Sequence, residues 1–154
     1  MSTSTAPTST RSVSELAWIR LMRVYQQIDR HTAEIMKQHE LSVPRFDVLV
    51  HAGASEGRSQ QELADAMFVT KGNICQLLDG MEAENLLYRR RKGRTNHIFL
   101  TDEGRDRRRQ ALEEQVAAIN TAMGSLTPEE QVTLHTLLRK LDRSLTNGEI
   151  WKGQ

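Results

Sequence analysis

The stretch SQQELADAMFVTKGNICQLLDGMEAE, residues 59–84, decides the fold expected for this chain. Ser59 and Glu62 have the spacing of a capping box, in which the two side chains satisfy free N–H groups at a helix start. They predict a short helix over residues 60–66, and after a three-residue turn Thr70 caps a longer helix that ends near residue 84. The apolar residues on one face of that second helix are Ile74, Leu77, Leu78 and Met81. Two capped helices joined by a tight turn are typical of a helix-turn-helix motif.

After this motif the sequence changes from a helical to a strand-like pattern. Residues 87–90 and 97–100 are two short runs with strand character, and residues 91–96 join them. Gly93 and Asn96 supply turn chemistry in the connection. We therefore expect a β-hairpin with a basic tip, which after a helix-turn-helix is a wing.

Amphipathic helices are predicted on both sides of this core. Residues 12–39 carry apolar residues at three- and four-residue steps, and a serine cap with an early proline at residues 42–44 begins a second helix. Thr101 and Thr127 cap two further helices, of which the last carries a long leucine stripe. These apolar stripes exceed what one small wing domain can cover. We therefore expect a homodimer held by residues 12–39 and 102–147.

The expected fold class is mainly α (α+β), in a single domain over residues 12–147 with a winged helix-turn-helix core at about residues 42–101. Residues 1–11 are almost all Ser, Thr, Ala and Pro and predict a disordered tail, and residues 148–154 form a second tail. No apolar run is long enough to cross a membrane. A single cysteine and the lack of a secretory signal favour the cytoplasm.

The formal net charge is only +1, but the charge is unevenly spread. Residues 89–109 hold nine basic and three acidic residues, a net of +6. The rest of the chain holds twelve basic and seventeen acidic residues, a net of −5. A basic segment on an otherwise acidic chain indicates one surface directed at a polyanion, although a solvated face is the commoner reason for a run of charge.

The outer face of the predicted helix 70–84 suits a DNA groove. Small and polar residues lie opposite Ile74, so no bulky apolar side chain blocks entry into a major groove. Gln76 and Asn73 carry amides suited to base edges, in particular those of adenine. Helix N-termini attract phosphates. The polar residues placed there are Ser59, Thr70 and Lys71.

Together these motifs resemble the MarR (multiple antibiotic resistance regulator) family. The matching segments are Gln61-Glu62-Leu63-Ala64, Thr70-Lys71, Ile74, Leu77-Leu78-Asp79, Met81-Glu82, Asn85-Leu86-Leu87 and Leu100-Thr101-Asp102-Glu103-Gly104. The flanking helices match in number and length, so the resemblance covers roughly residues 14–147. It implies a dimeric transcription regulator, a repressor that binds a palindromic operator in double-stranded DNA and is released by a small molecule.

The wing departs from the family pattern in two ways. Lys92 stands where the family usually has an Asp two residues before the arginine at the tip, and the hairpin is several residues shorter. The resemblance implies that Arg94 still enters a minor groove, without its orienting carboxylate, while the basic residues before it contact phosphates. The DNA-binding residues expected in full are Ser59, Gln60, Thr70, Lys71, Gly72, Asn73, Gln76, Arg90, Arg91, Lys92, Arg94, Thr95 and Asn96.

An effector site is implied by the resemblance alone. In the family, the groove between the first helices and the DNA-binding lobe holds aromatic anionic effectors, so we expect a small aromatic or anionic ligand. The candidate contacts are Trp18, Met22, Tyr25, Phe46 and His51. Packing in the core is the alternative role and is favoured for most of these residues.

Other chemistries have less support. Cys75 lies beside the apolar face of the predicted recognition helix, which favours inert packing over redox sensing. The five histidines are dispersed without metal-ligand spacing, and no nucleophile–base–orienter set can be assembled. We therefore expect no metal, no cofactor and no catalytic residue. The alternative function is a protein-interaction module or a small helical enzyme that does not bind DNA.

Overall fold

The computed structural model describes residues 11–146, and the expected tails lie outside them except for Arg11. The elements are α1 (Val13–Gln38), α2 (Val43–Ala54), α3 (Gln60–Ala66), α4 (Lys71–Ala83), β1 (Leu87–Lys92), β2 (Thr95–Leu100), α5 (Asp102–Met123) and α6 (Pro128–Thr146). The predicted class is confirmed, because the described chain is helical apart from one two-stranded antiparallel sheet. Of the described residues, 11–115 belong to one compact unit and 116–146 to a second, so the boundary lies within α5.

The helices begin at the capping residues that the sequence predicts. Ser42 accepts a hydrogen bond from the backbone N–H of Arg45 at 3.4 Å, and Pro44 lies in the first turn of α2. Ser12, which the sequence analysis did not name as a cap, begins α1 with a complete capping box. A side-chain acceptor at each of these positions satisfies N–H groups that the helix leaves without a partner. Local sequence therefore determines where each helix starts.

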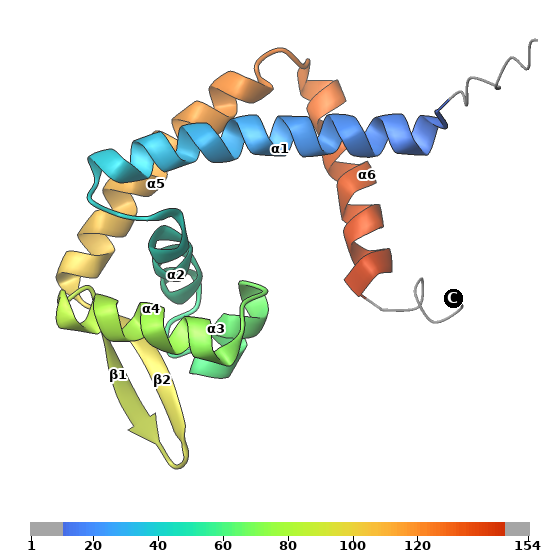
Figure 1. Cartoon of the computed structure of the whole chain (residues 1–154). Coiled ribbons are helices and arrows are strands. Elements are labelled where there is room, and N and C mark those ends of the chain that lie inside the picture. The colour runs from blue at the N-terminus through green and yellow to red at the C-terminus, as the bar shows by residue number, and fades with distance from the viewer. Residues whose placement is uncertain (1–10, 147–154) are drawn as a thin grey trace, which may run out of the picture. The chain divides into compact units, whose positions relative to one another are not determined.

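The core of the first unit lies between the helix-turn-helix, the wing and the adjoining ends of α1 and α5. Its largest fully buried side chains are Met36, Phe46, Val48, Leu49, Leu63, Ile74, Leu78, Met81, Leu86, Leu87, Ile98 and Leu100. They come from the C-terminal part of α1, from α2, α3 and α4, and from both strands and the segment before β1. This shared core fixes the wing and α4 relative to each other, and Figure 1 shows the hairpin projecting beside them.

The hairpin differs from the expected one in its turn. The register pairs Leu87 with Leu100 and continues to Lys92 with Thr95, so the strands are longer than predicted and only Gly93 and Arg94 join them. Gly93 has φ +63°, a left-handed conformation that glycine adopts without a steric penalty. Asn96 is a strand residue paired with Arg91 and supplies no turn chemistry.

α5 starts in close contact with the segment that leads into β1. A Cβ atom on Gly104 would overlap the backbone carbonyl of Leu86, so the approach requires glycine. The Thr101 hydroxyl donates to the carbonyl of Asn85 at 2.6 Å and accepts from the N–H of Gly104 at 3.0 Å. The start of α5 is therefore joined to the end of the helix-turn-helix.

The second unit contains the end of α5 and all of α6. Thr127 caps α6, accepting from the N–H of Glu130 at 3.3 Å, while the Glu130 carboxylate accepts from the N–H of Thr127 at 2.8 Å. No residue of α6 is buried among the residues the structure describes. Its exposed large apolar residues are Val132, Leu137, Leu138, Leu141 and Leu145.

Candidate nucleic-acid interface

The exposed face of α4 carries small and polar residues. Thr70 caps the helix and accepts from the N–H of Asn73 at 3.3 Å, while Ile74, Leu78 and Met81 are fully buried on the other face. A Cβ atom on Gly72 would meet nothing within 4 Å, so the surface there is open. The exposed residues near the helix start are Lys71, Gly72, Asn73 and Gln76. The helix can therefore present its N-terminal turns to a DNA groove without obstruction.

Ser59 is the N-cap residue of α3 and is buried. Its N–H donates to the Glu62 carboxylate at 2.7 Å, and its hydroxyl accepts from the N–H of Glu62 at 3.2 Å. Hydrogen bonding to the Glu62 carboxyl, first from the Ser59 backbone N–H and then from the Ser59 side chain, lowers the pKa of this carboxyl below its ordinary value. Ser59 is only 8% exposed and forms an isolated bridge with His97 of β2. The Ser59 hydroxyl is thus engaged in the cap, and its expected phosphate contact stays a prediction.

Gln60 links the two helices of the motif. Its amide Nε2 lies 2.6 Å from the Cys75 sulfur, and Cys75 is half-buried on α4. The next residue, Gln61, is exposed and donates to the Asp65 carboxylate at 2.8 Å. The packing role expected for Cys75 stays a prediction. The contact with Gln60 gives the sulfur a polar neighbour that the sequence did not indicate.

One face of the wing carries an aromatic and cationic stack. Tyr88 and Phe99 face each other across the strands with ring centroids 5.5 Å apart. The Arg90 guanidinium lies over the Phe99 ring, 5.4 Å from its centroid, in a cation–π contact. Further along β1, the Nε of Arg91 donates to the Gly93 carbonyl at 3.1 Å. The stack holds Arg90 close to the sheet, while Arg91, Lys92 and Arg94 are exposed at the far end.

Arg89 joins the wing to α4, a role the sequence analysis missed. Its guanidinium lies 2.6 Å from the Asp79 carboxylate and 3.2 Å from that of Glu82, and it donates to the Cys75 carbonyl at 3.3 Å. The Arg89 N–H also donates to Glu82 at 2.9 Å. Asp79 and Glu82 are three residues apart and so share a helix face, which is the signal that could have revealed the pairing.

The basic segment 89–109 is not one continuous cationic surface, which corrects the expectation from its net charge. On α5, Arg105 pairs with Glu56 at 2.5 Å, and Arg107 pairs with Glu103 at 3.1 Å and donates to the His39 carbonyl. Arg109 pairs with Asp106 at 3.7 Å. Within residues 11–146, the basic residues of this segment without an ion pair are Arg90, Arg91, Lys92, Arg94 and Arg108. Arg108 is half-buried against Gly53, so the exposed positive charge that carboxylates leave uncompensated lies on the wing.

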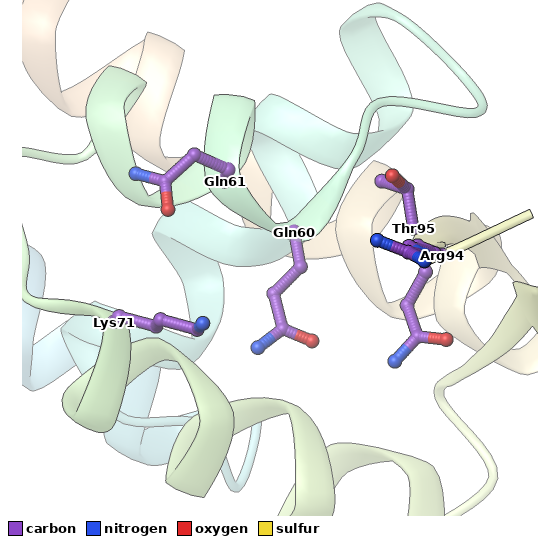
Figure 2. A pocket seen from close by; sticks show the side chains of 6 residues that line it. Gln60, Gln61, Lys71, Arg94 and Thr95 are labelled. Carbon is purple, nitrogen blue, oxygen red and sulfur yellow. The ribbon is translucent and has the colours of Figure 1, made fainter.

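A hollow of about 300 Å³ lies between α3, the start of α4 and the tip of the wing. Its lining residues are Gln60, Gln61, Lys71, Arg94, Thr95 and Asn96. In Figure 2, Lys71 and Arg94 lie on opposite sides of Gln60. The structure thus brings together five of the residues expected at the interface and adds Gln61, which the sequence analysis did not select.

The residues proposed for an effector are in different environments. Phe46 is 1% exposed and packs in the core, the alternative role left open by the sequence. Trp18 and Tyr25 are 60% and 58% exposed, and Met22 and His51 are half-buried. Burial raises the pKa of the nearby Asp47 carboxyl, and the positive potential of His51 partly opposes this. None of the five candidates lines the hollow beside the wing.

Two kinds of site are absent from residues 11–146. No helix in this range combines the length and apolarity that a membrane span requires. The same range contains no group of three or more His, Cys, Asp or Glu side chains placed to hold a metal ion.

Comparison with known proteins identifies the family of this chain. The model of the MarR family matches residues 39–109. An uncharacterised HTH-type transcriptional regulator of Bacillus anthracis is 31% identical over 142 residues, which are 92% of this chain and 97% of the relative.

Solved structures share the fold at lower sequence identity. AbsC, a MarR family regulator from Streptomyces coelicolor, has a TM-score of 0.80 at 22% identity over 91% of this chain and 99% of its own. MepR of S. aureus, solved in complex with DNA, has a TM-score of 0.75 at 21% identity over 88% of this chain and 99% of its own. The regulator RdhR-CbdbA1625 with bound 2,4-dichlorophenol has a TM-score of 0.76 at 24% identity over 94% of this chain and 89% of its own. The chain belongs to the MarR family of winged helix-turn-helix transcription regulators.

Proposed function

We propose that the protein is a dimeric repressor that binds a palindromic operator through α4 and the wing and is released by a small aromatic or anionic effector. The observation that carries the DNA-binding surface is the hollow between the two elements. There the open N-terminal turns of α4 lie next to wing cations that no carboxylate of residues 11–146 neutralises.

Direct base contacts are assigned to Gln76 and Asn73. Both are exposed on α4, and an amide can donate to and accept from one adenine edge in a major groove. Phosphate contacts are assigned to Gln60, Thr70, Lys71, Arg90, Arg91, Lys92, Thr95 and Asn96, with Gly72 allowing close backbone approach. The DNA complex of MepR supports this use of the fold. In this assignment the helix reads sequence and the remaining contacts position it.

A second copy of the chain is the partner that the terminal helices require. Leu137 is 60% exposed and Leu141 is 47% exposed on α6, and a continuous leucine stripe in water is unfavourable. α1 adds exposed apolar residues, among them Val13 and Trp18. A two-fold dimer presents two copies of α4, and such a dimer matches a palindromic site.

The dimer can be tested by sedimentation. The double change Leu137→Asp and Leu141→Asp should reduce the mass to that of one chain, because it places charges in the apolar contact. The matched control is Thr136→Asp with Lys140→Asp, which has the same spacing on a different face of the helix and should stay dimeric. A dimeric Leu variant would contradict this assignment of the interface.

A small aromatic effector is supported by the structural neighbour that holds 2,4-dichlorophenol. We propose that it lies between the first helices and the DNA-binding lobe, as the family resemblance implies. Trp18, Met22, Tyr25 and His51 are the side chains of this chain proposed to contact it. The test is DNA release by a panel of chlorophenols and aromatic carboxylates. Release that Trp18→Ala and Tyr25→Ala both abolish, with DNA affinity retained, supports the site, and release unaffected by either change contradicts it.

Footprinting on DNA upstream of the protein's own gene tests the proposed function as a whole. We expect a protected, symmetric site and lower transcription from that promoter when protein is added. Protection without symmetry would contradict the palindromic operator, and increased transcription would contradict the repressor role. Absence of any protected site, together with a bound protein ligand or a turned-over substrate, would favour the alternative functions.

A further inference from the structure

We propose that Arg45 is a positioning residue for operator recognition, which sets the rotation of α4 about its own axis by holding the C-terminal end of that helix against α2. The proposal rests on the proposed DNA-binding function, because it concerns how Gln76 and Asn73 are presented to the bases. Arg45 is not among the residues that the sequence predicts at the interface, and it does not line the hollow beside the wing.

Arg45 joins the start of α2 to the end of α4. Its Nη1 donates to both carboxylate oxygens of Glu84, at 2.7 Å and 2.8 Å. Glu84 is the C-cap residue of α4. Arg45 lies in the first turn of α2, where its backbone N–H donates to the Ser42 hydroxyl. Because both partners lie at helix ends, the contact relates the position of α2 directly to that of α4.

A glycine inside α4 makes room for this contact. Gly80 lies four residues before Glu84 and so shares its helix face. A Cβ atom on Gly80 would lie 3.1 Å from Nη2 of Arg45, closer than ordinary van der Waals contact. Glycine is less favourable than alanine in a helix interior. The packing of the guanidinium against α4 accounts for glycine at this position.

Arg89 holds the opposite flank of the same part of α4. Its guanidinium pairs with Asp79 and Glu82, which share another face of the helix. With about 100° between successive residues, that face lies about 150° around the helix from the face that meets α2. Figure 1 shows α4 between α2 and the hairpin, and α4 contacts both of them. The C-terminal half of α4 is therefore held by one arginine from α2 and one from the wing.

These two contacts restrict the rotation of α4 more closely than its apolar face does. Ile74 and Leu78 are buried between the two flanks on the inner side, and Gln76 is exposed between them on the outer side. Apolar burial has no preferred direction, whereas hydrogen bonds between charged groups do. A rotation of α4 would move the Gln76 amide away from a base edge, and a hydrogen bond weakens steeply when its angle is poor. Loss of the Arg45 contact should therefore weaken discrimination between DNA sequences.

The test compares Arg45→Gln, Glu84→Gln and the double variant on the footprinted operator and on a scrambled duplex of equal length. Both side chains are partly exposed, and such a pair contributes little to stability, so we expect the variants to fold. The matched control is Arg107→Gln, which removes the same charge from an arginine of similar exposure that pairs with Glu103 of its own helix. All proteins are the full chain, and circular dichroism confirms that each is folded.

We expect the ratio of operator affinity to scrambled-duplex affinity to fall about tenfold in each single variant, the size of one lost base contact. Affinity for the scrambled duplex should change by about twofold or less, because no phosphate contact is removed. The double variant should lose no more than either single variant, since the two residues act as one pair. Arg107→Gln should keep the wild-type ratio.

Equal losses on the two duplexes would overturn the proposal, because partial unfolding or lost charge weakens both alike. An unchanged ratio in the single variants, or losses that multiply in the double variant, would also overturn it. If Arg45→Gln does not fold, Glu84→Gln decides alone, because its amide has the shape of the carboxylate it replaces. Wild type that binds both duplexes equally would instead refute the proposed function.

Discussion

The wing and the start of α5 have similar composition but use their arginines differently. On α5, Arg105 pairs with Glu56, and Arg107 pairs with Glu103 of the same helix and donates to the His39 carbonyl, so the contacts with Glu56 and His39 fasten the helix within the first unit. Arg91 and Lys92 on the wing have no carboxylate partner among residues 11–146. A surface ion pair contributes little to stability and neutralises the field around it. Charge available for a polyanion therefore depends on where the acidic residues lie in space as well as on the number of cations.

The largest expected effect concerns the unpaired wing cations. Changing Arg90, Arg91 and Lys92 together to Ala should weaken binding to operator and to random duplex alike, by about a hundredfold near 0.15 M salt. It should also flatten the dependence of log affinity on log salt by about 0.9 for each phosphate that the variant no longer neutralises. Fluorescence anisotropy across a salt series measures both quantities.

The control for that comparison changes Arg105, Arg107 and Arg109 together to Ala. It removes the same formal charge, but from residues already paired with carboxylates. We expect nearly the wild-type salt slope. Equal flattening by the two triple variants would show that total charge, rather than unpaired charge, determines DNA affinity.

The next effect is on stability and concerns Arg89. Its side chain is 20% exposed and pairs with Asp79, which is exposed, and with Glu82, so Arg89→Ala leaves two carboxylates and the Cys75 carbonyl without their donor. We expect the free energy of unfolding to fall by about 2 kcal/mol in chemical denaturation. Arg109→Ala, which breaks only an exposed pair, should change it by about 0.5 kcal/mol or less. Similar losses of unfolding free energy in the two variants would show that Arg89 stabilises the fold no more than the exposed Arg109 does.

A change at Gln76 distinguishes contacts with bases from contacts with the DNA backbone. It is exposed on α4, and Gln76→Ala should cost about 1–3 kcal/mol on the operator and little on random duplex, because the variant cannot hydrogen-bond a base but keeps the wild-type charge. Competition binding with the two duplexes measures the difference. Equal losses on both would mean that another face of α4 contacts the bases.

The smallest effect concerns Glu62 and acid stability. Hydrogen bonds from Ser59 lower the pKa of this carboxyl below its ordinary value of 4.5, so the charged form is favoured in the folded chain. Its contribution to stability is therefore present above the unfolded-state pKa and is lost as the pH falls through the lower folded-state pKa. Glu62→Gln should reduce the loss of thermal stability between about pH 5 and pH 3. An unchanged dependence of thermal stability on pH would show that protonation of Glu62 is not measurably coupled to folding.

The parts of the fold that depend on nearby residues could be predicted from the sequence. Ser42, Ser59 and Thr70 begin helices at the expected residues because a cap acts within three residues of itself. The apolar face of α4 followed from helical periodicity, and Ile74, Leu78 and Met81 are fully buried. Their order, two capped helices followed by a hairpin, predicted a winged helix-turn-helix, and the resemblance then indicated the family.

The parts that depend on residues distant in sequence could not be predicted in the same way. Arg105 meets Glu56 across 49 residues, and Arg107 meets the His39 carbonyl across 68, so neither pairing is visible in local charge. The wing turn was predicted too long because residues 91–96 look like loop residues, yet cross-strand pairing extends the sheet to Lys92 and Thr95. The hollow beside Gln61 arises only when α3 and the wing tip are brought together.

Specific binding of a duplex through α4 and the unpaired cations of the wing underlies every function proposed for this chain. The decisive quantity is the affinity of the wild-type protein for the footprinted duplex and for a scrambled duplex of equal length, across a salt series. We expect nanomolar binding to the first and at least about a thousandfold weaker binding to the second, with a steep salt slope on both. Equal affinity for the two duplexes, or binding that does not change with salt, would contradict this mode of recognition.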